Sequence, residues 1–125
     1  MKIEAKKHLD LANRHLEKVQ AAWDDPTDWS DLAIYGFFCL ENAAMAAAVH
    51  FGLKRKKAVS NRDKIQLANS LHRKHGLPSV GKLLTQLHRA EKYAVYGDIT
   101  PPPLDPEDVA REIEEFVEAV SKILS

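Results

Sequence analysis

The stretch that decides the fold reads IYGFFCLENAAMAAAVHF, residues 34–51. Apolar side chains fall on almost every side of a helix with this sequence, and such a helix must be buried by neighbours over most of its surface. Residues 43–48 are all alanine except Met45, so another helix can approach closely there. We expect a helix from about Trp29 to Phe51, closed by Gly52. It is either the central helix of the domain or a helix that gives one face to a second copy.

Four further helices are predicted, one before this stretch and three after it. Apolar residues recur three or four positions apart in each of them, which is the helical period. The third begins with Ser60-x-x-Asp63, a capping-box pattern, and the fifth begins with Asp105 followed by Pro106. No run alternates between apolar and polar residues, so we predict an all-α, up-and-down bundle of about five helices in one domain spanning residues 1–125. The four helices run over about residues 3–23, from Ser60 to Gly76, from Val80 to Gly97, and from Asp105 onward.

The net charge of zero hides an uneven distribution. Between Lys54 and Lys92 there are eleven Lys and Arg against two acidic residues, Asp63 and Glu91. The densest run is Lys54, Arg55, Lys56 and Lys57, which is either a solvated loop or a basic patch. A basic segment can face phosphates or an acidic partner, and it can equally face the acidic segments of its own chain or of a twin.

The N-terminal residues and the central helix bear on location. Residues 1–7 are charged and contain no apolar signal-peptide core. Glu41 and Asn42 lie near the middle of the apolar run, where a carboxylate inside a membrane would cost about 2.5–3.5 kcal/mol. Cys39 has no partner for a disulfide within the chain. We therefore expect a cytoplasmic protein without a membrane partner.

The end of the fourth helix, HRAEKYAVYGD at residues 88–98, is the candidate binding site. Residues three, four and seven apart share a helix face, so Arg89, Tyr93 and Tyr96 can point together, with Lys92 nearby. A guanidinium beside phenols suits a site for a phosphate or a base. The alternative is a helix end whose tyrosine rings pack on the core and keep their hydroxyls in water.

Glu41 and Asn42 extend the candidate binding site onto the central helix. A carboxylate on an apolar helix needs a partner, because an unpaired buried charge costs several kcal/mol. Arg89 or Lys92 is the expected partner, and Asn42 is expected to join helices through its amide.

Metal and nucleophile patterns are weak by comparison. His72 and His75 are three residues apart on one helix, but no His-Glu-x-x-His pattern or cysteine set accompanies them. Cys39 is expected to be buried and unreactive. We expect no metal site, no cofactor and no catalytic nucleophile.

The chain resembles the HEPN domains, small helical proteins of prokaryotic defence and toxin–antitoxin systems that are often encoded beside a minimal nucleotidyltransferase. The resemblance covers nearly the whole chain in helix order and length, and is densest over residues 37–44 and 89–98. Active members are metal-independent ribonucleases with an Arg-x4–6-His motif where two subunits meet. Here the residue that follows a six-residue gap after Arg89 is Tyr96, and no Arg-x4–6-His occurs in the sequence. The resemblance therefore implies Arg89 as a phosphate contact without the ribonuclease histidine.

Three functions follow as expectations. The first is a non-catalytic subunit that binds a nucleotide or RNA, or partners a minimal nucleotidyltransferase, as a homodimer formed by the second and fourth helices. The second is a divergent ribonuclease toxin that uses Arg89 and Tyr96, although a tyrosine with a pKa near 10 is a poor base at neutral pH. The third is a pure protein-interaction bundle.

Overall fold

The computed structural model describes residues 2–24, 26–53, 60–95 and 103–125, and the side chains of residues 93–95 lie outside that description. The described residues form five α-helices and no strands, which confirms the predicted all-α bundle. The helices are α1 (Ile3–Ala22), α2 (Trp29–His50), α3 (Asn61–His75), α4 (Gly81–Val95) and α5 (Pro106–Leu124).

Helix α2 is the centre of the bundle, as its composition predicts. It packs against all four other helices, and most extensively against α1. Half of its residues are buried, among them Leu32, Phe37 and Leu40. The neighbouring helices of this one chain therefore account for most of its apolar surface.

Gly36 fixes how closely α2 approaches α4 and α5. A Cβ at this position would lie 2.9 Å from Cδ1 of Ile113 on α5 and 3.3 Å from Cδ1 of Leu87 on α4. Contacts below 3.4 Å are tighter than ordinary packing. The missing side chain therefore lets three helices meet at one point in the core.

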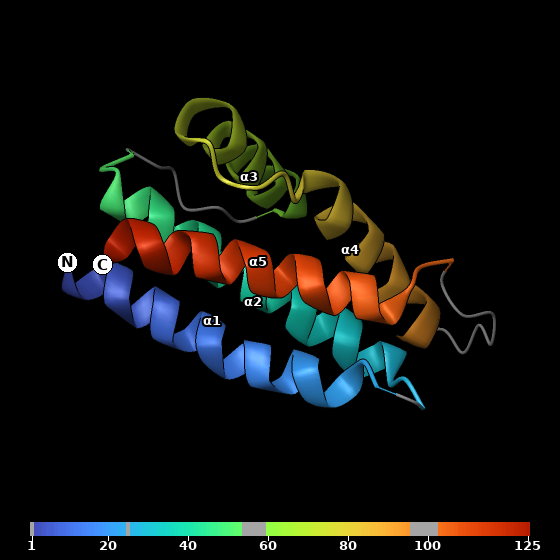
Figure 1. Ribbon diagram of the computed structural model, residues 1–125. Coiled ribbons are helices and arrows are strands. Elements are labelled where there is room, and N and C mark those ends of the chain that lie inside the picture. The colour runs from blue at the N-terminus through green and yellow to red at the C-terminus, as the bar shows by residue number, and fades with distance from the viewer. Residues whose placement is uncertain (1, 25, 54–59, 96–102) are drawn as a thin grey trace.

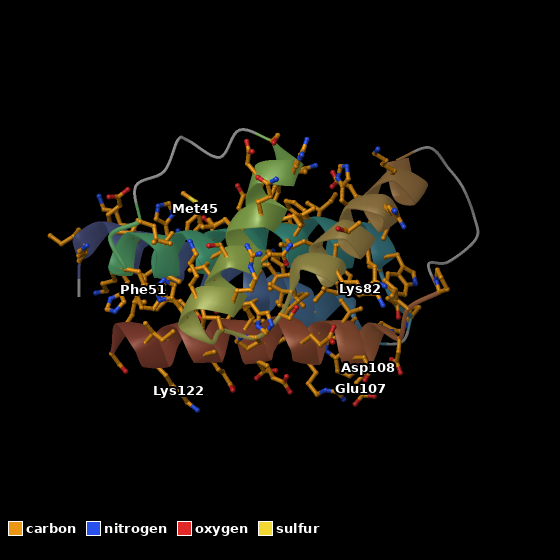
Figure 2. All side chains as sticks on the ribbon, turned by 90° about the horizontal axis from the view of Figure 1, so that it is seen from above. Met45, Phe51, Lys82, Glu107, Asp108 and Lys122 are labelled. Carbon is orange, nitrogen blue, oxygen red and sulfur yellow. The ribbon has the colours of Figure 1, made fainter. Side chains whose placement is uncertain are left out.

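Three long helices form the body of the molecule, and two shorter ones cover it. Helices α1, α2 and α5 run roughly along one axis, and the start of α1 and the end of α5 lie at the same end (Figure 1). Helices α3 and α4 lie over α2, and α3 crosses it at a steep angle (Figure 2). Helix α3 fully buries only Ala68 and Leu71, and six of its fifteen residues are exposed.

Side chains cap the starts of three helices, and the caps at Ser60 and Asp105 are those that the sequence predicts. The side chains of Asp28, Ser60 and Asp105 each accept a hydrogen bond from a backbone N–H in the first turn of α2, α3 and α5. Gly76 ends α3 with φ at 72°, a left-handed conformation that glycine adopts without steric cost. These caps fix where the basic helix α3 begins and ends.

Helix α2 is also long and apolar enough to cross a membrane, with a mean hydropathy of 1.6 over its most apolar window. Within the bundle, 61% of that window is buried. Length and composition are weak evidence for a span, because the core helix of a helical bundle meets the same test.

Candidate functional site

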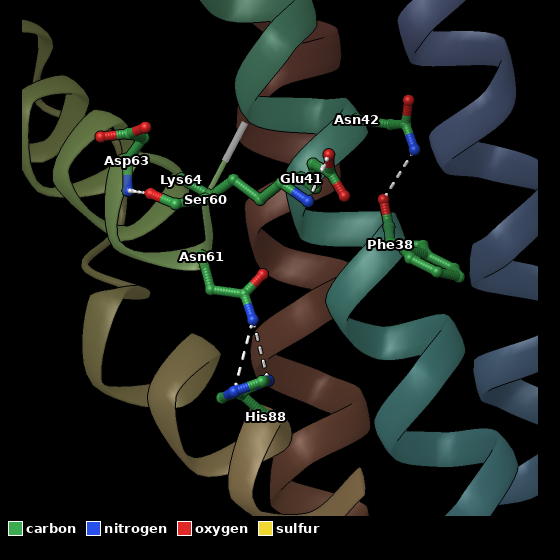
Figure 3. A network of polar contacts seen from close by, with 8 residues as sticks. All are labelled: Phe38, Glu41, Asn42, Ser60, Asn61, Asp63, Lys64 and His88. Carbon is green, nitrogen blue, oxygen red and sulfur yellow. Dashed lines mark hydrogen bonds and ion pairs between the residues drawn. The ribbon is translucent and has the colours of Figure 1, made fainter. Parts of the chain in front are cut away.

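Glu41 forms an ion pair with a residue of α3, a helix that the sequence did not indicate as its partner. Its Oε1 lies 3.0 Å from Nζ of Lys64 on α3, and the two side chains are 24% and 19% exposed (Figure 3). The expected partners, Arg89 and Lys92 on α4, are exposed and form no ion pair in the part of the chain that the structure describes. The prediction was wrong because α3 crosses α2 at Glu41. The spacing of apolar residues along a helix does not indicate where another helix crosses it.

Among the described residues, the hydrogen bond of the Asn42 side chain stays within its own helix and does not join two helices. Its amide donates to the backbone oxygen of Phe38 within α2, at 2.8 Å. The side chains of Glu41 and Asn42 leave α2 in different directions, Glu41 toward α3 and Asn42 toward α1 (Figure 3). The two residues therefore belong to different surfaces and do not form one site.

A second polar contact ties α3 to α4. The amide nitrogen of Asn61 lies 3.0 Å from Nδ1 and 3.3 Å from Nε2 of His88. An amide N–H can only donate, so the ring nitrogen that it reaches acts as an acceptor. Together with the Glu41–Lys64 pair, this contact holds the start of α3 against α2 and α4 (Figure 3).

The structure describes only part of the candidate binding site at residues 88–98. Arg89 and Lys92 are exposed on α4. Tyr96 and the basic run at residues 54–57 lie outside the described residues, as does the side chain of Tyr93. The meeting of Arg89 with the two tyrosines stays a prediction.

The exposed side chains of α3 and α4 share one electrostatic character. None of those described is a carboxylate, and all are cations, amides or histidine. Asp63 and Glu91, the acidic residues of these helices, are partly buried. We call this surface the basic face. It consists of Arg62, Gln66, Asn69, His72, Arg73, Lys74, Lys82, Arg89 and Lys92.

Helix α5 carries the opposite charge. Its exposed residues include five carboxylates, at positions 107, 108, 112, 115 and 118, against Arg111 and Lys122. Seen from above, α3 and α4 face the viewer, while Glu107, Asp108 and Lys122 point outward along the edge formed by α5 (Figure 2). Charge is therefore separated in space as well as along the sequence.

A depression lies against the middle of the basic face. It measures about 570 Å³, and the described residues that line it are Gln66, Asn69, His72 and Arg73 of α3. Sites for small molecules typically measure about 300–1,000 Å³. Among the described residues, the lining offers two amides, an imidazole and a guanidinium, which can bind a polar or anionic group.

The two histidines of α3 are engaged separately. The ring of His72 donates from Nδ1 to the backbone oxygen of Leu77 at 2.7 Å, because a carbonyl oxygen can only accept. The ring of His75 stacks on Phe51 with centroids 3.8 Å apart. Among the described residues, no group of three or more His, Cys, Asp or Glu is placed to hold a metal ion.

Two titratable groups between α1 and α2 have shifted pKa values. Burial raises the pKa of the Cys39 thiol to about 12, and its Sγ donates to the backbone oxygen of Ala12 at 3.3 Å. Burial lowers the pKa of His15, and the negative charge of Glu41 partly opposes that shift. The ring of His15 lies 5.8 Å from that of Tyr35 and 5.7 Å from that of Phe38. The burial of this cysteine agrees with the sequence prediction.

No family model, curated protein or solved structure matches this chain.

Sequence reasoning missed the outward stripe of α3. Arg62, Gln66, Asn69 and Arg73 recur at intervals of four, three and four residues, which places them on one side of the helix. Their spacing and their lack of carboxylates were available as signals. The prediction for this helix rested on its few apolar residues, whereas its polar side carries part of the basic face.

Proposed function

We propose that this chain is a non-catalytic, HEPN-like RNA-binding subunit whose basic face holds the phosphate backbone. One observation carries the proposal: the described exposed side chains of α3 and α4 include six Lys and Arg and no carboxylate. Lysine and arginine that neutralise phosphates release condensed counterions, and this supplies most of the sequence-independent affinity for nucleic acid. The basic face therefore suits a polyanion.

The placement of Arg89 links this surface to the family resemblance. Arg89 is exposed on α4, on the same face as Lys82 and Lys92. The resemblance gives it the role of a phosphate contact, and the absence of the motif histidine from the sequence favours binding over cleavage. The Asn61–His88 contact next to Arg89 joins α3 to α4, the two helices that carry the basic face.

Acidic α5 adds to the proposal by orienting the molecule. Its five exposed carboxylates repel a phosphate backbone. RNA is therefore expected to approach the α3–α4 side, which lies away from that edge (Figure 2).

The proposal includes a homodimer. Because α2 is packed inside its own bundle, little of its apolar surface is left to contact a second copy. Phe38 is nevertheless 41% exposed, and Leu11 on α1 is 39% exposed. A second copy that contacts this α1–α2 edge leaves both basic faces free. Phe38→Ser is expected to lower the molecular mass seen in sedimentation equilibrium, whereas a wild-type monomer at micromolar concentration would contradict the homodimer.

The test measures binding and cleavage of a labelled single-stranded RNA of 20 nucleotides. Wild-type protein should bind it intact, with affinity falling roughly 50-fold between 50 and 200 mM salt if about four phosphates are contacted. Arg89→Ala and Arg73→Ala should each weaken binding several-fold and flatten the salt dependence by about 0.7 in log–log slope. Arg14→Ala, which removes an exposed arginine of α1, is the matched control and should change neither.

Two results would overturn the proposal. Cleavage of the RNA that is lost in Arg89→Ala would instead establish the ribonuclease. Absence of binding at low salt would leave the basic face to an acidic protein, such as a nucleotidyltransferase partner.

A further inference from the structure

We infer that the depression on α3 is a base-binding subsite that selects adenine in the bound RNA. This inference rests on the proposed function and adds a sequence preference to it. The basic face by itself would bind any RNA, because contacts to phosphate carry no sequence information. The depression differs from the rest of that face in carrying two adjacent carboxamides.

The first argument is placement. Gln66 and Asn69 lie one turn apart on α3, between Arg62 on one side and Arg73 on the other, and all four are exposed. A strand that follows the stripe would meet a guanidinium, then two amides, then a second guanidinium. The space of about 570 Å³ beside Gln66, Asn69 and Arg73 is sufficient for one nucleotide.

The second argument is that neighbouring groups hold the lining in place. A Cβ on Gly81 would overlap Oδ1 of Asn69 and would lie 2.9 Å from its Cγ. The carboxamide of Asn69 therefore occupies the space that this glycine leaves at the start of α4. His72 is held by its hydrogen bond to Leu77, which leaves Nε2 as the nitrogen free to meet a ligand. Groups held in position lose less entropy when they bind.

The third argument is chemical. A carboxamide presents a donor and an acceptor side by side, and Asn and Gln pair in this bidentate way with the 6-amino group and N7 of adenine. In single-stranded RNA these edges are open to side chains. Guanine, which offers two acceptors there, is better matched by arginine. Two amides, with no exposed carboxylate among the described residues of α3 and α4, therefore favour adenine, while Arg73 is placed for the adjoining phosphate.

The experiment compares fluorescence anisotropy of labelled oligo(A), oligo(U) and oligo(C) of eight nucleotides with the whole chain. Wild-type protein should bind oligo(A) at least about fivefold more tightly, the lower end of what one bidentate base contact provides. The double variant Gln66→Ala/Asn69→Ala should reduce oligo(A) affinity to that of oligo(C) and leave oligo(C) affinity unchanged. Asn13→Ala, which removes an exposed amide of α1, should change none of them.

Gly81→Ala provides a second variant that leaves every lining side chain in the sequence. It should displace the Asn69 carboxamide and reduce the preference for oligo(A), with circular dichroism reporting that the helices are intact. Equal binding of all three oligonucleotides by wild-type protein would overturn the adenine subsite while the RNA-binding proposal stands. A preference that survives the double variant, or a preference for oligo(U), would also overturn it. Failure of all three to bind at low salt would remove both proposals.

Discussion

Lys64 on α3 extends toward Glu41 on α2 and places its Nζ 3.0 Å from the carboxylate. The same ammonium lies 5.5 Å from the centre of the Phe37 ring. Both charged side chains are mostly covered, so the pair is less screened by water than a surface ion pair. It joins the helix that carries much of the basic face to the central helix.

Breaking this pair should destabilise the fold. Glu41→Gln and Lys64→Met are each expected to lower the free energy of unfolding by about 1–2 kcal/mol, between the values for exposed and fully buried pairs. A double-mutant cycle in urea should give a coupling of about 1 kcal/mol. Arg111→Met is the matched control, because its pair with Asp108 is 60% and 54% exposed and should contribute less than about 0.5 kcal/mol. A coupling indistinguishable from zero would contradict the role given to Lys64.

Gly36→Ala tests the close approach of α2, α4 and α5. Alanine raises helix propensity by about 1 kcal/mol, yet the added Cβ would press on Cδ1 of Ile113 at 2.9 Å. We expect a net destabilisation of about 1–3 kcal/mol in thermal or urea unfolding. Adding Ile113→Val, which removes that Cδ1, should recover part of the loss. A Gly36→Ala protein more stable than wild type would show that the core yields at this point.

His15 should make stability depend on pH. Burial lowers its pKa in the folded state below the ordinary 6.5, although Glu41 partly opposes the shift. The unfolded chain therefore takes up the proton first as the pH falls below 6.5. The stability present above that pH is lost progressively as the pH falls toward the lower pKa of His15 in the folded state. Urea unfolding between about pH 7 and pH 5 should show a steeper loss of stability for wild type than for His15→Gln. Identical slopes in the two proteins, with His8→Gln as a reference on the same helix, would count against this assignment.

Cys39 should be inert toward thiol reagents in the native protein. Only the thiolate reacts, and a pKa of about 12 leaves almost none of it at neutral pH. The buried thiol should react with an aromatic disulfide reagent only as fast as the chain opens, and promptly in urea. Rapid stoichiometric labelling under native conditions would show that α1 and α2 separate readily.

The helices were predictable because each is specified locally. The apolar period of α5, the cap at Ser60 and the stop at Gly76 each depend on residues only a few positions apart in the sequence, and all are found where the sequence placed them. The partner of Glu41 was not predictable in the same way. It depends on the angle at which α3 crosses α2, which is set by packing between residues far apart in the sequence. For the same reason, the sequence pointed to the end of α4 and overlooked the surface that α3 and α4 form together.

The separation of charge between α3–α4 and α5 gives this molecule an electric dipole without a net charge. A dipole turns in the field of a charged object before contact, so encounters with a polyanion begin in a preferred orientation. A chromatographer would find such a protein retained on cation-exchange and anion-exchange resins alike, near the pH at which its net charge vanishes. An isoelectric point of about 7.0 thus does not predict how strongly this bundle binds to a charged surface.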